Sequence, residues 1–266
     1  MRLTMLGTGN AVTTHCFNTC FVLEENGEYL LVDGGGGNGL MVQLRRADID
    51  LTRVRHVFLT HKHVDHLLGI VWLMRMYLQS MRMGSFDGEA FIYGHDEVLA
   101  LLLDFAHKLL PARDVALIGT RLHLVEVFDG ETLRLIGHDV TFFDIQSTKT
   151  KLFGFALDLG GGRRLTCCGD EAITPVGKRY ARNSDWLLHE AFCLYTDRDM
   201  FRPYEKHHST MRDACQTAEE LGVRNLLIYH TEDSDLPHRK ERYGAEGRAY
   251  FSGNLFIPND LEVIEL

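Results

Sequence analysis

Three histidines and one aspartate fall within six consecutive positions, residues 61–66, of this 266-residue chain. An apolar, β-branched segment, residues 54–59, precedes them, and a helix-like apolar segment, residues 67–78, follows. On extended backbone, side chains two positions apart project to the same side, so His61 and His63 face one small volume. Imidazole and carboxylate groups suit a borderline divalent cation such as zinc. The segment therefore predicts a metal site where a strand turns into a helix.

Asp65 and His66 indicate a second cation. The two residues are adjacent, so both would crowd an ion that His61 and His63 already hold. A second ion close to the first removes this conflict. The alternative is a histidine-rich surface loop without a ligand, but so dense a cluster with no polar tract around it favours metal binding. We therefore expect all four side chains to be metal ligands.

The pattern His61-x-His63-x-Asp65-His66 resembles the HxHxDH signature of the metallo-β-lactamase superfamily. The resemblance implies an α+β fold, a four-layer αββα sandwich, with a dinuclear metal site at one edge. It also implies a metal-dependent hydrolase that attacks its substrate with a metal-activated hydroxide. No linker, charge block or repeat divides the sequence, so we expect residues 1–266 to form a single hydrolase domain.

The predicted secondary structure follows an order that suits this fold. Apolar strands flank Asn26-Gly27, which is a strong hairpin signal. Helix-like segments at 67–83 and 97–110 follow the metal motif, and short strands alternate with turns through residues 122–168. Strands, then helices, then strands again predict two sheets face to face with helices outside.

The strand that ends at Asp33 leads into four glycines, residues 34–37. No GK[ST] sequence follows, which disfavours a phosphate-binding loop. We expect the glycines to let backbone pass close to the metal site. Asp33 itself resembles the superfamily's aspartate that orients the ligand loop, and hydrogen-bonding partners of this kind are usual behind metal ligands. A plain turn is the alternative.

Two later strand ends match further ligand positions of the superfamily. The apolar strand 165–168 leads through a glycine to Asp170, and the resemblance implies that Asp170 bridges the two ions with its two oxygens. Gly-Asp is also a common turn, so the distance from the first motif carries this assignment. The apolar strand 225–229 ends at His230, which resembles the last histidine ligand. A core histidine is a poor explanation, because its ring nitrogens would need partners.

One expected ligand is missing. The superfamily usually supplies another histidine before the hairpin that leads to the bridging aspartate, but residues 143–155 contain none. Gln146 or Ser147 lies nearest the expected place, and a glutamine oxygen is a weaker zinc ligand than imidazole. Weak ligation by Gln146, a water in its place, and firm binding of only one ion all stay open; His138 is a less favoured replacement. We expect two Zn²⁺ ions, with Mn²⁺ as the alternative metal and the first site weakened.

Two further segments resemble ribonuclease Z. Residues 185–192 match its HEA-aromatic segment, and the His-Ser-Thr sequence that begins at His208 matches the start of one of its helices. In that family the glutamate and the histidine together deliver a proton to the leaving oxygen. The resemblance therefore implies catalytic roles for Glu190 and His208, while Asp65 orients the attacking water and takes up its proton.

Ribonuclease Z usually carries a long insertion that clamps transfer RNA, whereas residues 154–170 leave room only for a hairpin. Transfer RNA is therefore a doubtful substrate. We expect hydrolysis of phosphodiesters in an anionic small-molecule or nucleotide-type substrate, which Lys149 and Lys151 could meet. One alternative is a carboxylic ester, lactone or thioester hydrolase at the same site. Another is a partly metallated, non-catalytic binding domain.

Charge and composition limit the possible binding partners and the cellular compartment of the protein. The formal net charge of −9 argues against non-specific binding to nucleic acid or to an anionic membrane over a wide surface. The N-terminus lacks a secretory signal pattern, and no apolar segment is long enough to span a bilayer. The six cysteines show no CxxC spacing, as is typical of reduced thiols. We expect a cytoplasmic protein without a membrane partner; the sequence leaves its oligomeric state open, a homodimer included.

Overall fold

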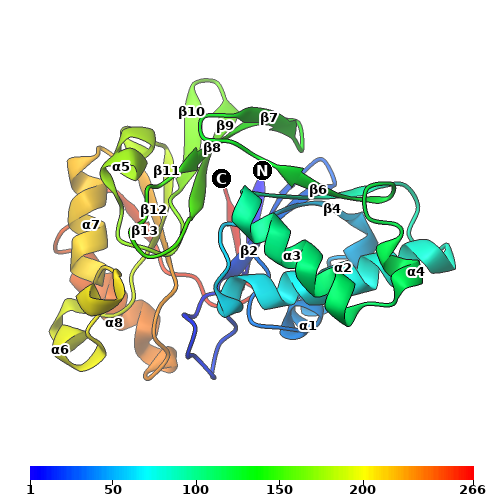
Figure 1. Cartoon of the computed structure of the whole chain (residues 1–266). Helices are drawn as coiled ribbons and strands as arrows, with labels where there is room; N and C mark the ends of the chain where they lie inside the picture. The colour runs from blue at the N-terminus through cyan, green and yellow to red at the C-terminus, as the bar shows by residue number, and fades with distance from the viewer.

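A computed structural model describes all residues, 1–266, as two seven-stranded sheets packed face to face with helices on both outer sides (Figure 1). This confirms the predicted αββα sandwich. The strands of the first sheet, in spatial order, are β14 (Val263–Glu265), β1 (Arg2–Gly7), β2 (Cys20–Glu25), β3 (Glu28–Val32), β4 (Val54–Phe58), β5 (Ala90–Gly94) and β6 (Leu122–Glu126). The strands of the second are β13 (Asn254–Phe256), β12 (Asn225–Tyr229), β11 (Trp186–Glu190), β10 (Arg163–Cys167), β9 (Phe153–Gly160), β8 (His138–Asp144) and β7 (Thr132–Leu135).

Helices cover the outer face of each sheet (Figure 1). Beside the first sheet lie α1 (Gly39–Arg46), α2 (Val64–Met83), α3 (Asp96–Leu109) and α4 (Ala112–Val115). Beside the second lie α5 (Pro175–Ala181), α6 (Arg198–Phe201), α7 (Met211–Glu220) and α8 (Arg239–Gly247). None of them combines the length and the apolar composition that crossing a bilayer requires.

Three apolar layers hold the sandwich together. Between the sheets, the ring of Phe58 lies 4.9 Å from that of Phe142 and 5.8 Å from that of Phe155, which joins β4 to β8 and β9. The other two layers lie between each sheet and its helices. These layers explain the nearly continuous apolar sequences of central strands such as β2 and β12, since each sheet buries both of its faces.

The direction of the strands determines where the predicted site residues lie. In the first sheet β3, β4, β5 and β6 are mutually parallel, and in the second β10, β11, β12 and β13 are. The carboxyl ends of neighbouring parallel strands meet at one edge of a sheet, where open sheets commonly bind ligands. Residues 33, 60–66, 170, 190 and 230 lie at or just beyond such ends.

Helix α2 begins at Val64, three residues before the predicted start, so Asp65 and His66 lie in its first turn. The helix packs closely on the glycine loop after β3. The Gly34 amide donates to the His66 carbonyl at 2.9 Å, and the Gly69 amide donates to the Gly35 carbonyl at 2.9 Å. A Cβ atom on Gly69 would overlap the Gly34 carbonyl. The glycines thus allow the close backbone approach that was predicted for this loop.

Candidate metal centre

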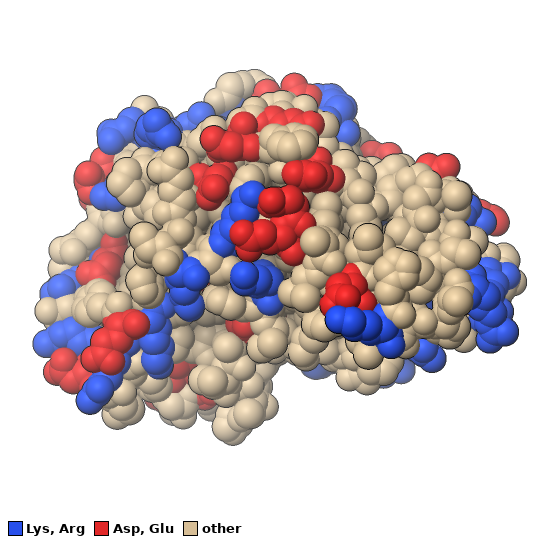
Figure 2. Space-filling model, viewed as in Figure 1, with Lys and Arg blue, Asp and Glu red and all other residues tan.

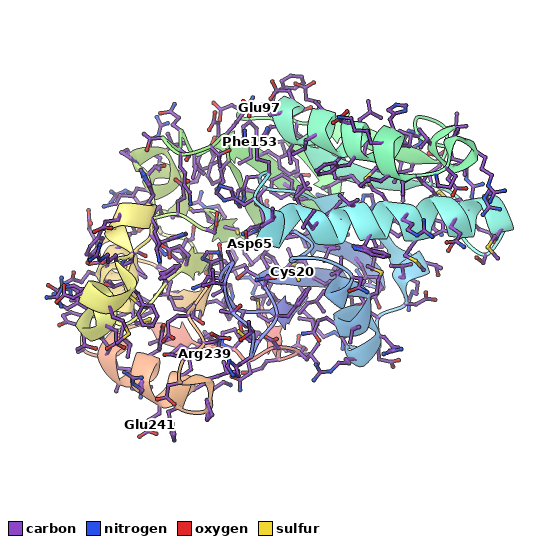
Figure 3. All side chains as sticks on the ribbon, turned by 60° about the horizontal axis from the view of Figure 1, so that its bottom comes forward. Cys20, Asp65, Glu97, Phe153, Arg239 and Glu241 are labelled. Atoms are coloured by element: carbon purple, nitrogen blue, oxygen red, sulfur yellow. The ribbon has the colours of Figure 1, made fainter.

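Six predicted ligand side chains converge between the two sheets. The four in the 61–66 motif come from the turn after β4 and from the first turn of α2. Asp170 follows β10, and His230 follows β12 in a left-handed conformation with φ of 58°. All six are buried except His63, which is half-buried. Figure 3 shows Asp65 at the N-terminal end of α2, beside the junction of the two halves.

Four of these side chains surround one small space. His66 Nε2 lies 3.3 Å from Asp65 Oδ2 and 3.4 Å from Asp170 Oδ2. His230 Nε2 lies 3.4 Å from Asp65 Oδ2 and 3.5 Å from Asp170 Oδ2. Zinc ligands at about 2.0–2.1 Å in a tetrahedron lie about 3.3 Å from one another. Asp65, His66 and His230 therefore offer donor atoms close enough together to share one cation, and Asp170 Oδ2 lies within 3.5 Å of the two histidines.

The remaining two histidines lie on the other side of Asp170. His61 Nε2 is 3.5 Å from Asp170 Oδ1 and 2.8 Å from His63 Nδ1. The two oxygens of Asp170 thus face two different groups of histidines, with Oδ1 toward His61 and Oδ2 toward His66 and His230.

The chemistry of the donor atoms fits divalent cations. His66 Nε2 and Asp170 Oδ1 are buried and have no hydrogen-bond partner within the chain. Leaving a buried polar atom unsatisfied costs about 1–3 kcal/mol. Nitrogen and carboxylate oxygen atoms held this way are the ligands that zinc takes in proteins, so a cation would satisfy both atoms.

Burial and charge at the centre set the protonation of His61 and Asp170. Burial lowers the pKa of His61 well below its ordinary value, so its imidazole is neutral and has a free lone pair. Burial alone would raise the pKa of Asp170, but the neighbouring imidazoles of His61 and His66 hold that pKa well below its ordinary value. The carboxylate is therefore ionised, which is the form that binds metal.

Asp33 supports the ligand turn from behind, as predicted. Its carboxylate accepts the Thr60 amide at 2.8 Å and the Thr60 hydroxyl at 2.8 Å, and its Oδ2 lies 2.7 Å from His66 Nδ1. The Thr60 hydroxyl oxygen also lies 2.9 Å from His61 Nδ1. These contacts fix the ring orientation of two histidines and leave Nε2 of each pointing into the centre.

Glu190 and His208 lie together next to the metal ligands. Glu190, at the end of β11, accepts the Ser209 amide with Oε1 at 2.5 Å, and its Oε2 lies 3.7 Å from His208 Nδ1. The His208 ring lies 5.0 Å from that of His230. Burial raises the pKa of Glu190 well above its ordinary value and lowers that of His208 to about 3. Burial thus disfavours the charged form of both groups.

A cavity of about 440 Å³ opens onto this centre. Its wall includes the metal-cluster residues His63, Asp65, Asp170 and His230, together with His208. The rest of the lining is Asn10, Ala11, Val12, Lys62, Val64, Lys149, Phe192 and Lys206. This volume is in the range of small-molecule sites.

The structure does not bring every predicted residue to the centre. Gln146 is exposed, with a φ of 58°, and does not line the cavity. Ser147 donates its hydroxyl to Glu171 Oε1 at 2.7 Å. Lys151 makes an ion pair with Asp96, and His138 contacts the Asp158 carbonyl at the far end of β8. Ligation by Gln146 stays a prediction.

Sequence reasoning missed several residues of the cavity. Lys62 lies inside the metal motif, but lysine is not a zinc ligand, so the motif gives it no role. Phe192 is the last residue of the segment 185–192 but had no role assigned to it, Lys206 lies two residues before His208, and the loop that contains Val12 has no motif of its own. Arg239 also went unnoticed, although its buried guanidinium donates to the hydroxyls of Thr8 and of Thr231, the residue after His230. Its contacts span the whole chain, so no local pattern marks it.

Comparison with known proteins agrees with this geometry. A sequence profile described as the β-lactamase superfamily domain matches residues 29–231. Ribonuclease Z of Synechococcus sp. (strain CC9311) is 27% identical over 322 aligned positions, which cover 99% of this chain and 98% of that protein. Ribonuclease Z of Myxococcus xanthus (strain DK1622) is also 27% identical, with coverage of 95% and 96%.

Solved structures show the same fold. The metallo-β-lactamase fold protein YhfI from Bacillus subtilis superposes with a TM-score of 0.79 at 18% identity, covering 99% of this chain and 98% of that one. The short form of human tRNase Z has a TM-score of 0.72 at 22% identity, with coverage of 100% and 99%. A diphosphatase from the PhnP family has a TM-score of 0.75 at 17% identity, with coverage of 100% and 97%.

Proposed function

The chain belongs to the metallo-β-lactamase superfamily and is a metal-dependent hydrolase, and from this premise we propose that it hydrolyses phosphodiesters at a dinuclear metal site. The observation that carries the proposal is the position of Asp170 among the histidines, with Oδ1 3.5 Å from His61 and Oδ2 3.4 Å from His66 and 3.5 Å from His230. A carboxylate between two such groups suits a pair of cations. The relatives named ribonuclease Z support phosphodiester chemistry.

We assign the ligands by these contacts. His61, His63 and one oxygen of Asp170 would hold the first cation. The second would be held by Asp65, His66, His230 and the other oxygen of Asp170. Gln146 lies away from the cavity, so a water in the place of the missing histidine is the arrangement that we propose for the first site. Zn²⁺ is the preferred metal, with Mn²⁺ as the alternative.

Two cations in this site would supply a nucleophile near neutral pH by lowering the pKa of water, and would offset charge on the phosphoryl oxygens. Side chains around the cations would orient the water and transfer the protons. Asp65 faces the cavity and lies beside both histidines of the second group, where it can orient the attacking water and accept its proton.

His208 is positioned to protonate the leaving oxygen. Its Nδ1 and the Oε2 of Glu190 are both buried without partners and face each other at 3.7 Å. With the proton on Glu190, its O–H can donate to His208 Nδ1 while the Nε2–H of the same ring donates to the leaving group. The pair can thus deliver a proton without first acquiring charge, and such general acid catalysis contributes about 10²- to 10⁴-fold.

The size of the site favours a small substrate over transfer RNA. Strands β9 and β10 are joined by a short turn at residues 161–162, without an inserted arm. On the face that Figure 2 shows, acidic and basic side chains are mixed and form no continuous basic surface. Together with the net charge of −9, this argues for a small anionic ester.

The test compares substrate classes with the zinc- or manganese-loaded protein. We expect turnover of bis(4-nitrophenyl) phosphate to exceed turnover of a panel of lactones, carboxylic esters and thioesters. His208→Ala should cost more with a poor alcohol leaving group than with nitrophenolate, which needs no proton. His138→Ala is the matched control, since His138 lies at the far end of β8. Preferred hydrolysis of lactones or thioesters would replace the phosphodiesterase proposal, and equal losses on both leaving groups would remove the general-acid role of His208.

A further inference from the structure

The wall of the active-site cavity carries three lysines that neither the metal site nor the proton relay uses. Lys62, Lys149 and Lys206 all line it. They come from three separate segments: the turn before α2, the loop between β8 and β9, and the 3₁₀ turn before His208. In a chain with a net charge of −9, the only acidic residues of the same wall are Asp65 and Asp170, which belong to the metal cluster.

Lys149 and Lys206 lie on adjoining loops. The Thr148 hydroxyl oxygen is 3.5 Å from His207 Nδ1, and the Ala172 amide donates to the His207 carbonyl at 3.0 Å. Each lysine is the sequence neighbour of a residue in the first of these contacts. The two lysines therefore reach the same cavity from neighbouring loops.

These two lysines have no acidic partner. Lys62 makes an exposed ion pair with Glu97 at 3.3 Å, whereas Lys149 and Lys206 form no salt bridge. The Lys206 ammonium lies 4.7 Å from the centre of the Phe192 ring, and that ring stacks on His208 at 4.9 Å. Lys206 is thus held over the catalytic side of the cavity with its charge unneutralised.

The count of charges exceeds what one diester needs. A phosphodiester carries a single negative charge, and two divalent cations beside Asp65 and Asp170 already offset it. Lys149 and Lys206 are both exposed at the cavity wall, so their ammonium groups are available to a second anion of the substrate. The lining also includes exposed apolar side chains, with Val12 79% exposed and Val64 62% exposed.

We propose that Lys149 and Lys206 form a second anion subsite, and that the substrate is a small organic phosphodiester that carries an additional terminal phosphate. This inference rests on the proposed phosphodiesterase function and names its substrate class. The metal centre binds the scissile diester, the two lysines bind the terminal phosphate, and Val12 and Val64 contact the organic part. The cavity of about 440 Å³ accommodates a molecule the size of a nucleotide.

A matched pair of substrates tests the subsite. The first is thymidine 5′-(4-nitrophenyl phosphate), and the second is the same ester with an added 3′-phosphate. We expect kcat/KM of the metal-loaded protein to be about tenfold higher for the second, a preference that two partly exposed lysines can supply and that added salt should weaken. Lys149→Met and Lys206→Met, which keep the apolar stem, should each reduce the preference, and the double variant should abolish it. Lys178→Met is the control, because Lys178 pairs with Glu220 away from the cavity.

A binding measurement separates failure of the subsite from failure of the proposed function. Calorimetry should show tighter binding of adenosine 3′,5′-bisphosphate than of adenosine 5′-monophosphate to the metal-loaded protein, and the double variant should lose the difference.

If neither ester is hydrolysed but the bisphosphate preference holds, the phosphodiesterase proposal fails and the subsite stands. Equal affinities, equal kcat/KM values for the two esters, or equal losses on both in the lysine variants would overturn the subsite. Faster cleavage of a short oligoribonucleotide than of the bisphosphorylated ester would show that the second phosphate belongs to a polymer, which would overturn the small-molecule assignment.

Discussion

Oδ2 of Asp33 lies 2.7 Å from Nδ1 of His66, and both residues are buried. This contact comes from the end of β3 and crosses to the first turn of α2. It fixes the tautomer of His66 with Nε2 toward the other ligands, so the geometry of the metal centre depends on a residue that does not contact the metal space itself.

Replacing Asp33 should therefore weaken metal binding. Asp33→Asn keeps the shape of the side chain but removes its charge and one of its acceptors for Thr60 and His66. Loss of such a supporting contact typically costs about 10- to 100-fold in metal affinity. Competition with a fluorescent zinc chelator measures the change. Asp114→Asn is the control, because Asp114 is also buried and charged but pairs with Arg82 away from the centre; a similar loss in both variants would contradict this role for Asp33.

The two cations should bind with different strength. The second group has Asp65, His66 and His230 close together with one oxygen of Asp170 beside the two histidines, whereas the first has His61, His63 and the other oxygen of Asp170. We expect zinc titration to show a tight and a weaker step, with His230→Ala removing the tight one and His61→Ala the weaker one. Gln146→Ala should change neither affinity by more than about twofold, as for an ordinary surface substitution. A larger loss in that variant would identify Gln146 as a ligand.

Glu190→Gln should give a more stable but less active protein. Burial raises the pKa of Glu190 well above its ordinary value of 4.5. When the pKa of a carboxyl group is higher in the folded than in the unfolded protein, the free energy of unfolding is largest at pH values below the pKa of the unfolded protein. It falls as the pH rises toward and through the pKa of the folded protein, because folding then keeps a buried charge or a bound proton. Glutamine cannot ionise and still accepts the Ser209 amide, so the variant should melt higher than the parent at about pH 8 and equally near pH 4, by thermal unfolding.

The same variant should lose activity with poor leaving groups, since an amide cannot pass a proton to His208. Each unit of pKa shift corresponds to about 1.4 kcal/mol, so the difference in unfolding free energy reports the shift directly. A variant that is less stable than the parent across this pH range would show that Glu190 is ionised in the folded protein.

Arg239 should couple stability to metal affinity. Its guanidinium donates to Thr8 and Thr231 at 2.8 and 2.9 Å and to the Pro258 carbonyl at 2.6 Å, which joins both sheets to the C-terminal segment directly behind His230. Arg239→Met leaves these acceptors in the interior without their donor, and should cost about 1–3 kcal/mol of unfolding free energy for each acceptor left unsatisfied. The displaced Thr231 should also weaken zinc binding.

Arg242→Met is the matched control from the same helix. Arg242 makes partly exposed ion pairs with Asp197 and Asp235, which are worth about 0.2–1 kcal/mol. Chemical denaturation and chelator competition on both variants separate the two contributions. Unchanged zinc affinity in Arg239→Met would limit Arg239 to a purely structural role.

The fold and the ligand cluster were accessible from sequence because both rest on local patterns. The apolar strands that end at Asp33, Asp170 and His230 each place a polar residue just past a buried segment, and His61 to His66 combine residue types that rarely occur together by chance. The structure brings these side chains to one centre, as expected.

Other features depend on contacts between distant segments. Lys206 resembles any surface lysine until the fold sets it over Phe192, and Arg239 resembles a solvent-exposed helical residue until Thr8, Thr231 and Pro258 surround it. The start of α2 was placed three residues late because Val64 and Asp65 carry no strong helix signal. No periodicity in one segment records a partner that lies elsewhere in the chain.

Metal analysis of the purified protein, combined with hydrolysis of bis(4-nitrophenyl) phosphate, tests the central claim most directly. After loading with zinc or manganese and removal of free ions, we predict two ions per chain and measurable hydrolysis, with Asp170→Asn losing both. Less than one ion per chain, together with no hydrolysis after metal is added, would contradict the assignment of this cluster as a dinuclear catalytic centre.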